Sequence, residues 1–160
     1  MNIDYILILM GWIITIILLF KFIPRNKLCE AQVAFLFKLS ITWVSGLVVS
    51  QLGLIVYPVR FFPNANKTSF SFEYFIYPSI CALFITNYPE KKSRFQKFMY
   101  YFYFCTYITI AEVFVERYTN ILKYVHWTWY ETWITLFITF FISRTYNLWF
   151  FKLLKKEGHT

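Results

Sequence analysis

Residues 3–20 read IDYILILMGWIITIILLF, a run with one charged residue, Asp4. Crossing the hydrocarbon of a membrane takes about 20 mostly apolar residues, so a run of this length predicts a transmembrane helix. A secretory signal would carry basic residues before a shorter apolar core and a small-residue cleavage site after it. Neither feature is present here, so we expect the run to remain in the protein as a membrane helix.

Further apolar runs follow along the chain, separated by short polar connections. The composition agrees with them: 59% of the 160 residues are hydrophobic and 15% are charged, whereas soluble domains average about 45–50% and about 25%. We therefore predict an all-α fold, a single transmembrane domain over residues 1–160 with five transmembrane helices. The predicted spans are 3–20, 34–57, 72–88, 98–118 and 130–151.

The positive charges predict the orientation of these helices. The net charge is +8, but the basic residues form short clusters between apolar runs instead of one solvated face, which argues against a nucleic-acid partner. Lysines and arginines concentrate on the cytoplasmic side of membrane proteins. The N-terminus is then predicted outside and the C-terminus in the cytoplasm. The side predicted to be cytoplasmic carries Lys21, Arg25, Lys27, Lys91, Lys92, Arg94, Lys97, Lys152, Lys155 and Lys156, and the opposite side carries Arg60, Lys67, Arg117 and Lys123.

The second run contains a stripe of small residues. Their spacings of four, four and three place them on one helix face, where small side chains let a neighbouring backbone approach closely. We therefore predict that this helix lies centrally and packs through that face. The stripe comprises Thr42, Gly46, Ser50 and Gly53.

Carboxylates in the predicted outer half of the bundle are the part of the chain that burial in hydrocarbon does not explain. Glu112 and Glu116 lie one helical turn apart, and Glu131 borders a hydroxyl stripe that includes Thr135 and Thr139. Carboxylates and hydroxyls need polar partners inside a membrane. We take these five residues as the candidate polar site, with Arg117, Lys123 and Arg60 as possible counter-charges.

Other charged residues have simpler interpretations. Lys38, near the start of the second predicted span, is expected to extend its ammonium to the interface, and Arg144 is expected to do the same at the inner side. Glu73, at the start of the third span, is expected to be interfacial. No metal or cofactor site is predicted, because Cys29, Cys81 and Cys105 are widely spaced and unpaired in pattern, and His126 and His159 fall outside the spans.

The second half of the chain contains a set of short motifs: EYFIYP at 73–78, Glu112, ERYT at 116–119, KY at 123–124, WTWY at 127–130, ITLFIT at 134–139 and WFF at 149–151. With these motifs the chain resembles an uncharacterised family of small multi-spanning membrane proteins from spore-forming Gram-positive bacteria such as bacilli and clostridia. The resemblance covers about residues 73–152, and the first half matches in hydropathy alone. It implies a bacterial plasma membrane as the location, and it carries no activity.

Three functions remain open from the sequence. The leading interpretation is an accessory or partner-binding membrane subunit without enzymatic activity, since no nucleophile elbow, HExxH motif or nucleotide loop is present. Its partners would be the lipid bilayer and another membrane protein. The first alternative is an ion or proton permeation element that uses the same carboxylates. The second is an intramembrane lipid-modifying enzyme with a glutamate as general base.

Overall fold

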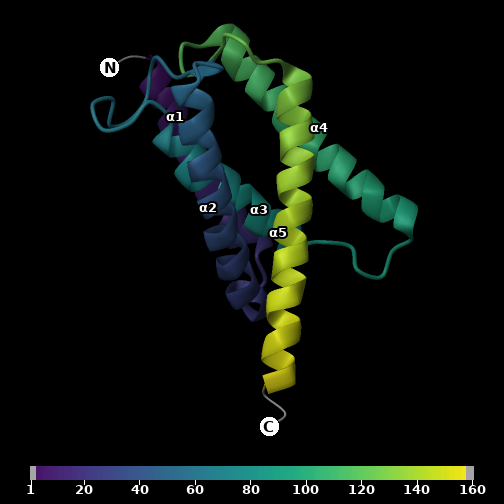
Figure 1. Cartoon of the computed structure of the whole chain (residues 1–160). Helices are drawn as coiled ribbons and strands as arrows, with labels where there is room; N and C mark the ends of the chain where they lie inside the picture. Colours follow the sequence, from purple (N-terminus) through teal and green to yellow (C-terminus); the bar gives the residue numbers. More distant parts are fainter. Residues whose placement is uncertain (1–2, 158–160) are drawn as a thin grey trace.

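The computed structural model describes residues 3–157, without the side chain of Glu157. Apart from one pair of two-residue strands, its regular elements are helical (Figure 1). Four helices are long and apolar enough to cross a membrane. They are α1 (Ile3–Phe22), α2 (Leu28–Gln51), α4 (Arg94–Tyr118) and α5 (Trp129–Glu157).

A shorter apolar helix precedes α4. It consists of a π-helical segment, η2 (Phe70–Ile76), continued by α3 (Tyr77–Thr86). Pro78 gives a local cause for the wider π turn, because proline lacks an amide donor and its ring conflicts with the carbonyl four residues before it. A short 3₁₀ turn, η1 (Arg25–Lys27), joins α1 to α2.

The ends of the helices follow local capping rules. Ser93 and Gln96 form a capping box at the start of α4: the Gln96 amide donates to Ser93 Oγ at 3.3 Å, and the Ser93 amide donates to Gln96 Oε1 at 3.2 Å. At the end of α2, Gly53 has φ +69°, which favours glycine. The amides of Gly53 and Leu54 donate to the carbonyls of Ser50 and Val49. This is a Schellman motif that stops the helix.

One end of the molecule is closed by the loops 52–69 and 119–128. We call it the hairpin end, because β1 (Ile55–Val56) and β2 (Lys123–Tyr124) pair there as an antiparallel ladder, with Ile55 opposite Tyr124. The start of α1 lies at the same end, since the Asn120 amide donates to Asp4 Oδ1 at 3.3 Å. Figure 1 shows these loops capping the helices on the side where the N-terminus lies.

The α1–α2 turn and the end of α3 meet at the other end of the molecule, which we call the basic end. Lys27 Nζ donates to the Thr86 carbonyl at 2.5 Å, and Asn87 Nδ2 donates to the Phe22 carbonyl at 3.1 Å. The η2–α3 helix therefore runs from the hairpin end to the basic end. The basic end is named for its side chains Lys21, Arg25, Lys27, Lys91, Lys92, Arg94 and Lys97.

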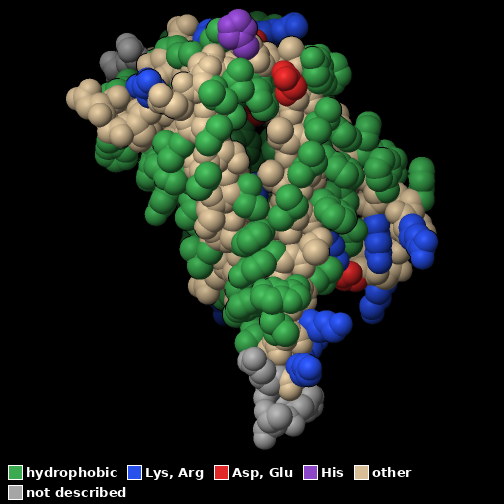
Figure 2. Space-filling view, viewed as in Figure 1, with side chains coloured by type: hydrophobic (Ala, Val, Ile, Leu, Met, Phe, Trp, Pro, Cys, Tyr) green, Lys and Arg blue, Asp and Glu red, His purple; other side chains and the backbone are tan. Residues whose placement is uncertain are grey.

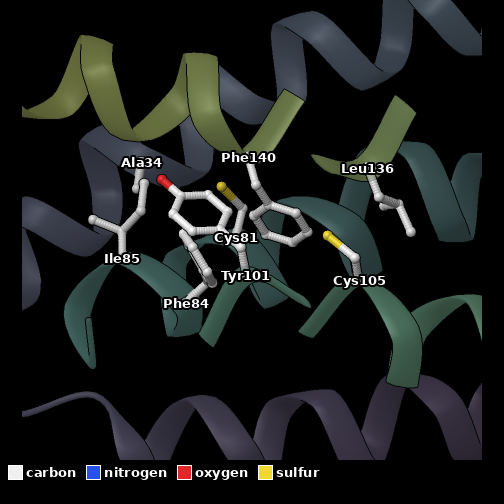
Figure 3. Close-up of a cluster of buried hydrophobic side chains, with 8 residues drawn as sticks. All are labelled: Ala34, Cys81, Phe84, Ile85, Tyr101, Cys105, Leu136 and Phe140. Atoms are coloured by element: carbon white, nitrogen blue, oxygen red, sulfur yellow. The ribbon is translucent and has the colours of Figure 1, made fainter. Parts of the chain in front are cut away.

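A cluster of buried apolar side chains joins α2, α3, α4 and α5 (Figure 3). Phe84 is fully buried at its centre, with Phe140 packed 4.7 Å away between ring centroids. α1 contributes no side chain to this buried cluster and exposes most of its large apolar residues. The cluster comprises Ala34, Cys81, Phe84, Ile85, Tyr101, Cys105, Leu136 and Phe140.

The second predicted span was displaced. We predicted 34–57, but α2 covers Leu28–Gln51 and Ile55–Val56 form β1. The residues after Gly53 are as apolar as a helix interior, so hydropathy alone does not mark the boundary. Gly53 itself lies beyond the helix and is therefore not part of its packing face.

Candidate functional site

Glu112 on α4 is held by hydroxyl groups from three other elements. Its Oε1 accepts hydrogen bonds from the Tyr124 hydroxyl at 2.6 Å and from Thr132 Oγ1 at 2.9 Å, and its Oε2 accepts one from the Tyr77 hydroxyl. These donors belong to β2, α5 and α3. Through these three hydrogen bonds Glu112 ties four elements together.

The two tyrosines of the hairpin end that face carboxylates remain neutral donors. Burial raises the pKa of Tyr124 well above its usual range, and Glu112 raises it further. Burial also raises the pKa of Tyr57, with Glu73 adding to the effect. Each phenol therefore keeps its proton for the carboxylate that it contacts.

Lys38 is buried in the middle of the bundle, and the interfacial position predicted for it is wrong. Its side chain is 1% exposed, and its ammonium donates to Thr139 Oγ1 at 2.5 Å and lies 4.7 Å from the centre of the Phe140 ring. Lys38 comes ten residues after the start of α2, so it lies about 15 Å along the helix. That distance is about half of a 30 Å hydrocarbon layer.

Glu73 is also buried, which corrects the interfacial position predicted for it. Its side chain is 7% exposed, and Oε1 accepts from the Tyr57 hydroxyl at 3.3 Å. The residue lies in the π-helical segment, which packs against α2. Thr42 Oγ1 donates to the Glu73 carbonyl at 2.7 Å.

Gly46 explains how η2 approaches α2 so closely. A Cβ added to Gly46 would lie 2.7 Å from Glu73 Cγ and 2.8 Å from Thr68 Oγ1, closer than such atoms pack. Thr42, Gly46 and Ser50 are all buried on this face of α2. The structure thus buries three members of the predicted small-residue stripe, with Thr42 and Gly46 against η2, and leaves out Gly53.

The buried side chains of Lys38 and Glu73 and the half-buried side chain of Glu112 line one cleft. It has a volume of about 200 Å³ and lies between α2 and α5, with the η2–α3 helix behind it and the hairpin end above it. Figure 2 shows a hollow between these two helices beneath the hairpin end. We call it the polar cleft. Its polar lining residues are Lys38, Thr42, Ser45, Tyr57, Glu73, Tyr77, Glu112, Trp127, Thr132, Thr135 and Thr139.

The polar cleft is closed towards the basic end. Leu136 forms part of its lining, and Phe140 packs under the Lys38 ammonium. Both residues belong to the buried apolar cluster of Figure 3. The cleft is therefore a blind pocket in this conformation, with ionisable side chains on its wall and apolar side chains at its floor.

The other predicted carboxylates lie elsewhere. Glu131 caps the start of α5: its Oε2 accepts from the amide and the hydroxyl of Thr128 at 2.7 and 2.8 Å. The Glu116 carboxylate makes no hydrogen bond within residues 3–156, and its backbone carbonyl accepts from Lys123 Nζ at 2.6 Å. Of the predicted site, Glu112, Thr135 and Thr139 meet in the cleft, and Glu116 and Glu131 do not.

The predicted counter-charges do not pair with these carboxylates. Arg60 donates to the backbone carbonyls of residues 57, 63 and 66 and so holds its own loop. Arg117 lines a separate shallow groove beside Tyr118. Within residues 3–156 the one ion pair joins Arg144 to Glu90 at 2.5 Å.

Arg144 is predicted to extend its guanidinium to the interface at the inner side, but the structure buries it against the loop after α3. Its side chain is buried, and the guanidinium lies 3.4 Å from the centre of the Tyr88 ring. Glu90 and Tyr88 from the loop after α3 thus hold α5 at the basic end through an ion pair and a cation–π contact.

Sequence reasoning missed Lys38, Glu73 and the tyrosines that contact the carboxylates. One signal was present: Lys38 precedes Thr42, Gly46 and Ser50 at the same four-residue spacing and so shares their face.

No family model, curated protein or solved structure matches this chain. Within residues 3–156, no three metal-ligating side chains form a group suited to an ion.

Proposed function

We propose that the protein crosses the membrane five times, with the η2–α3 helix as the third crossing. The contacts of this helix at both ends of the molecule support the proposal, since its last residues meet the α1–α2 turn at the basic end. The basic end would face the cytoplasm, which leaves the N-terminus outside and the C-terminus inside. The resemblance of residues 73–152 favours a bacterial plasma membrane.

We further propose that the protein is an accessory subunit that binds a membrane partner through the polar cleft. The proposal rests on the buried ammonium of Lys38, which makes few hydrogen bonds for its three donors. An ammonium has three donors, and the one hydrogen bond that Lys38 makes within the described residues is to Thr139. No carboxylate forms an ion pair with it there. A buried charge needs polar partners, so the cleft is suited to receive an acceptor from outside the chain.

The size of the cleft favours a side chain over a free small molecule. Its volume of about 200 Å³ is below the range of about 300–1,000 Å³ that is typical of ligand pockets. Its flanks are apolar, because Ile41 and Val49 of α2 and Ile138 of α5 line it, and Ile138 is about half exposed. A transmembrane helix of the partner would contact these flanks and place one polar side chain in the cleft.

The geometry gives less support to the two alternatives. An ion or proton path would need polar groups that continue towards the basic end, but Phe140 and the buried cluster close the cleft there. A lipid-modifying enzyme would need a carboxylate free to act as a base, but Glu112 already accepts three hydroxyl hydrogen bonds.

Site-specific photo-crosslinking in native membranes tests partner binding. A crosslinking amino acid at Ile138, which lines the cleft and is half-exposed, should trap one companion protein, whereas the same amino acid at Ile17 on α1 should not. Lys38→Met should abolish the Ile138 adduct while the protein stays folded. The exposed Lys155→Met serves as the matched control and should retain the adduct.

Two results would count against the proposal. An Ile138 adduct that persists in Lys38→Met would show that the ammonium does not hold the partner. Lipid adducts alone at Ile138 would leave the cleft without a protein partner. Reconstitution into vesicles addresses the permeation alternative: ion flux in the wild-type protein that disappears in Glu112→Gln would favour that alternative over ours.

A further inference from the structure

A second cavity lies on another side of the η2–α3 helix, next to the polar cleft. It has a volume of about 600 Å³ and is bounded by α1, the η2–α3 helix and α4. In Figure 1, α4 diverges from the other helices towards its first residues. We call it the apolar groove. Its polar groups lie near its ends, with Asn87 towards the basic end and Glu112 towards the hairpin end.

The dimensions of the groove suit one hydrocarbon chain. Along α4 its lining extends from Tyr100 to Val115, which is about 22 Å at 1.5 Å per residue. Spread over that length, about 600 Å³ corresponds to a mean cross-section of about 27 Å². A helix at least 10 Å wide would need about 80 Å². The groove therefore fits one hydrocarbon chain more closely than a whole helix.

An apolar groove does not by itself select a lipid, because lipid tails are as apolar as the side chains that line it. Selection must come from a headgroup at one of its ends. The end of the groove at the basic end is formed by Phe22 and Asn87, which a hydrogen bond joins. Lys21 places its ammonium 5.5 Å from the centre of the Phe22 ring.

Further cations flank the same end of the groove. Lys91, Lys92 and Arg94 are exposed and follow Asn87 along the chain, and Lys97 precedes Tyr100 by one helical turn. The acidic residue in this loop, Glu90, is paired with Arg144. Figure 2 shows basic side chains gathered at the start of α4. Clusters of this kind between membrane helices recognise anionic lipid headgroups.

We propose that the apolar groove holds one acyl chain of an anionic phospholipid, whose headgroup phosphate contacts the cations at the basic end. The proposal rests on the proposed membrane crossings, but it stands independently of partner binding at the polar cleft. A length of about 22 Å exceeds the half-thickness of a hydrocarbon layer, about 15 Å, so the groove accommodates the whole chain of a lipid from one leaflet.

Native mass spectrometry of the purified protein tests the headgroup part of the proposal. The probes are phosphatidylglycerol and phosphatidylcholine with identical acyl chains. The wild-type protein should retain one phosphatidylglycerol and bind it at least tenfold more tightly than phosphatidylcholine. Replacement of Lys91, Lys92 and Arg94 by glutamine should reduce this preference by tenfold or more, since each cation near the surface contributes about 1 kcal/mol.

A matched variant controls for general surface charge. Lys152, Lys155 and Lys156 are exposed at the end of α5 and do not line the groove. Their replacement by glutamine removes the same charge and should leave the preference close to that of the wild type. Equal loss in both triple variants, or equal binding of the two lipids by the wild type, would overturn the proposal.

Side chains of increasing size at one lining position test whether the groove holds the acyl chain. Ala111 lines the groove, so Ala111→Leu should weaken lipid retention, and Ala111→Trp should abolish it. Its neighbour Ile110 is exposed and does not line the groove, so Ile110→Trp is the control and should retain lipid. Retention of phosphatidylglycerol by a folded Ala111→Trp variant would contradict the groove as the site, and so would unchanged retention in Ala111→Leu.

Discussion

The polar cleft and the apolar groove lie on two sides of the same short helix and differ in almost every respect. The cleft places Lys38, Glu73 and Glu112 around a small blind pocket, whereas the groove is larger and its walls are almost entirely apolar. Tyr77 and Glu112 line both cavities, and they are hydrogen-bonded to each other. One interaction thus forms part of the boundary between the two environments.

The two sides of this helix show how the fold places polar groups in an apolar bundle. The π-helical segment and Gly46 bring η2 against α2 on the cleft side, and Glu73 is buried there with Thr42 and Tyr57 as neighbours. On the groove side, the same helix presents Phe72, Ile76 and Ile80. The apolar face needs no partners in hydrocarbon, whereas each charged group on the other face does.

Loss of the shared carboxylate should have the largest effect on stability. Glu112→Ala leaves the hydroxyls of Tyr77, Tyr124 and Thr132 without their acceptor, at a cost of about 1–3 kcal/mol for each buried group that stays unpaired. We expect the free energy of unfolding in mild detergent to fall by about 3 kcal/mol or more.

Glu116→Ala is the matched control for this prediction. Glu116 lies one turn further along α4, and its carboxylate makes no hydrogen bond within residues 3–156. We expect a change within about 0.5 kcal/mol. Equal losses in the two variants would show that Glu112 does not join the two sides of the molecule.

The second prediction compares glycines on the two sides. Gly46→Ala on the cleft side forces a Cβ against Glu73 and Thr68, and overpacking of this kind costs about 1–3 kcal/mol. Gly11→Ala on the groove side meets Ile76 Cδ1 at 3.5 Å, an ordinary contact. It should be neutral or stabilise α1 by up to about 1 kcal/mol. Thermal unfolding of both variants checks the pair, and a neutral Gly46→Ala would refute the close approach of η2.

The third and smallest effect concerns Thr139. Thr139→Val removes the hydroxyl that accepts from Lys38 and should lower the free energy of unfolding by about 1–2 kcal/mol. Thr145 is its control on the same helix, because its hydroxyl also donates to a carbonyl four residues earlier but contacts no charge. Thr145→Val should change the free energy of unfolding by less than about 0.5 kcal/mol. Equal free energies of unfolding for the two variants would contradict the assignment of Thr139 as the hydrogen-bond partner of Lys38.

The long helices could be predicted from the sequence because run length and hydropathy depend on local composition. The end of α2 could not, since Leu54 to Tyr57 are apolar in a turn and a strand as they would be in a helix. Gly53 was the local signal for that boundary. The same error misplaced Lys38. A helix that starts at residue 34 puts Lys38 near the interface, whereas α2 begins at Leu28, and Lys38 therefore lies ten residues into the helix.

The candidate site was also predictable only in part, because some of its contacts are local and others join distant elements. Glu112 stands out in an apolar run, so its need for partners follows from the sequence. The identity of those partners depends on how β2, α3 and α5 pack against α4. The spacing of residues along the chain does not predict this tertiary packing. Glu131 and Arg60, by contrast, satisfy local backbone and capping groups, as short-range hydrogen-bonding rules allow.

The free energy of unfolding of Lys38→Met, measured on the isolated protein in detergent, tests the central claim most directly. If the ammonium lacks sufficient partners within the chain, its replacement by an apolar side chain of similar size should leave stability unchanged or raise it by about 1–4 kcal/mol. A fall of about 3 kcal/mol or more would contradict the account. It would mean that the charge of Lys38 is fully satisfied inside the bundle and that the polar cleft awaits no partner.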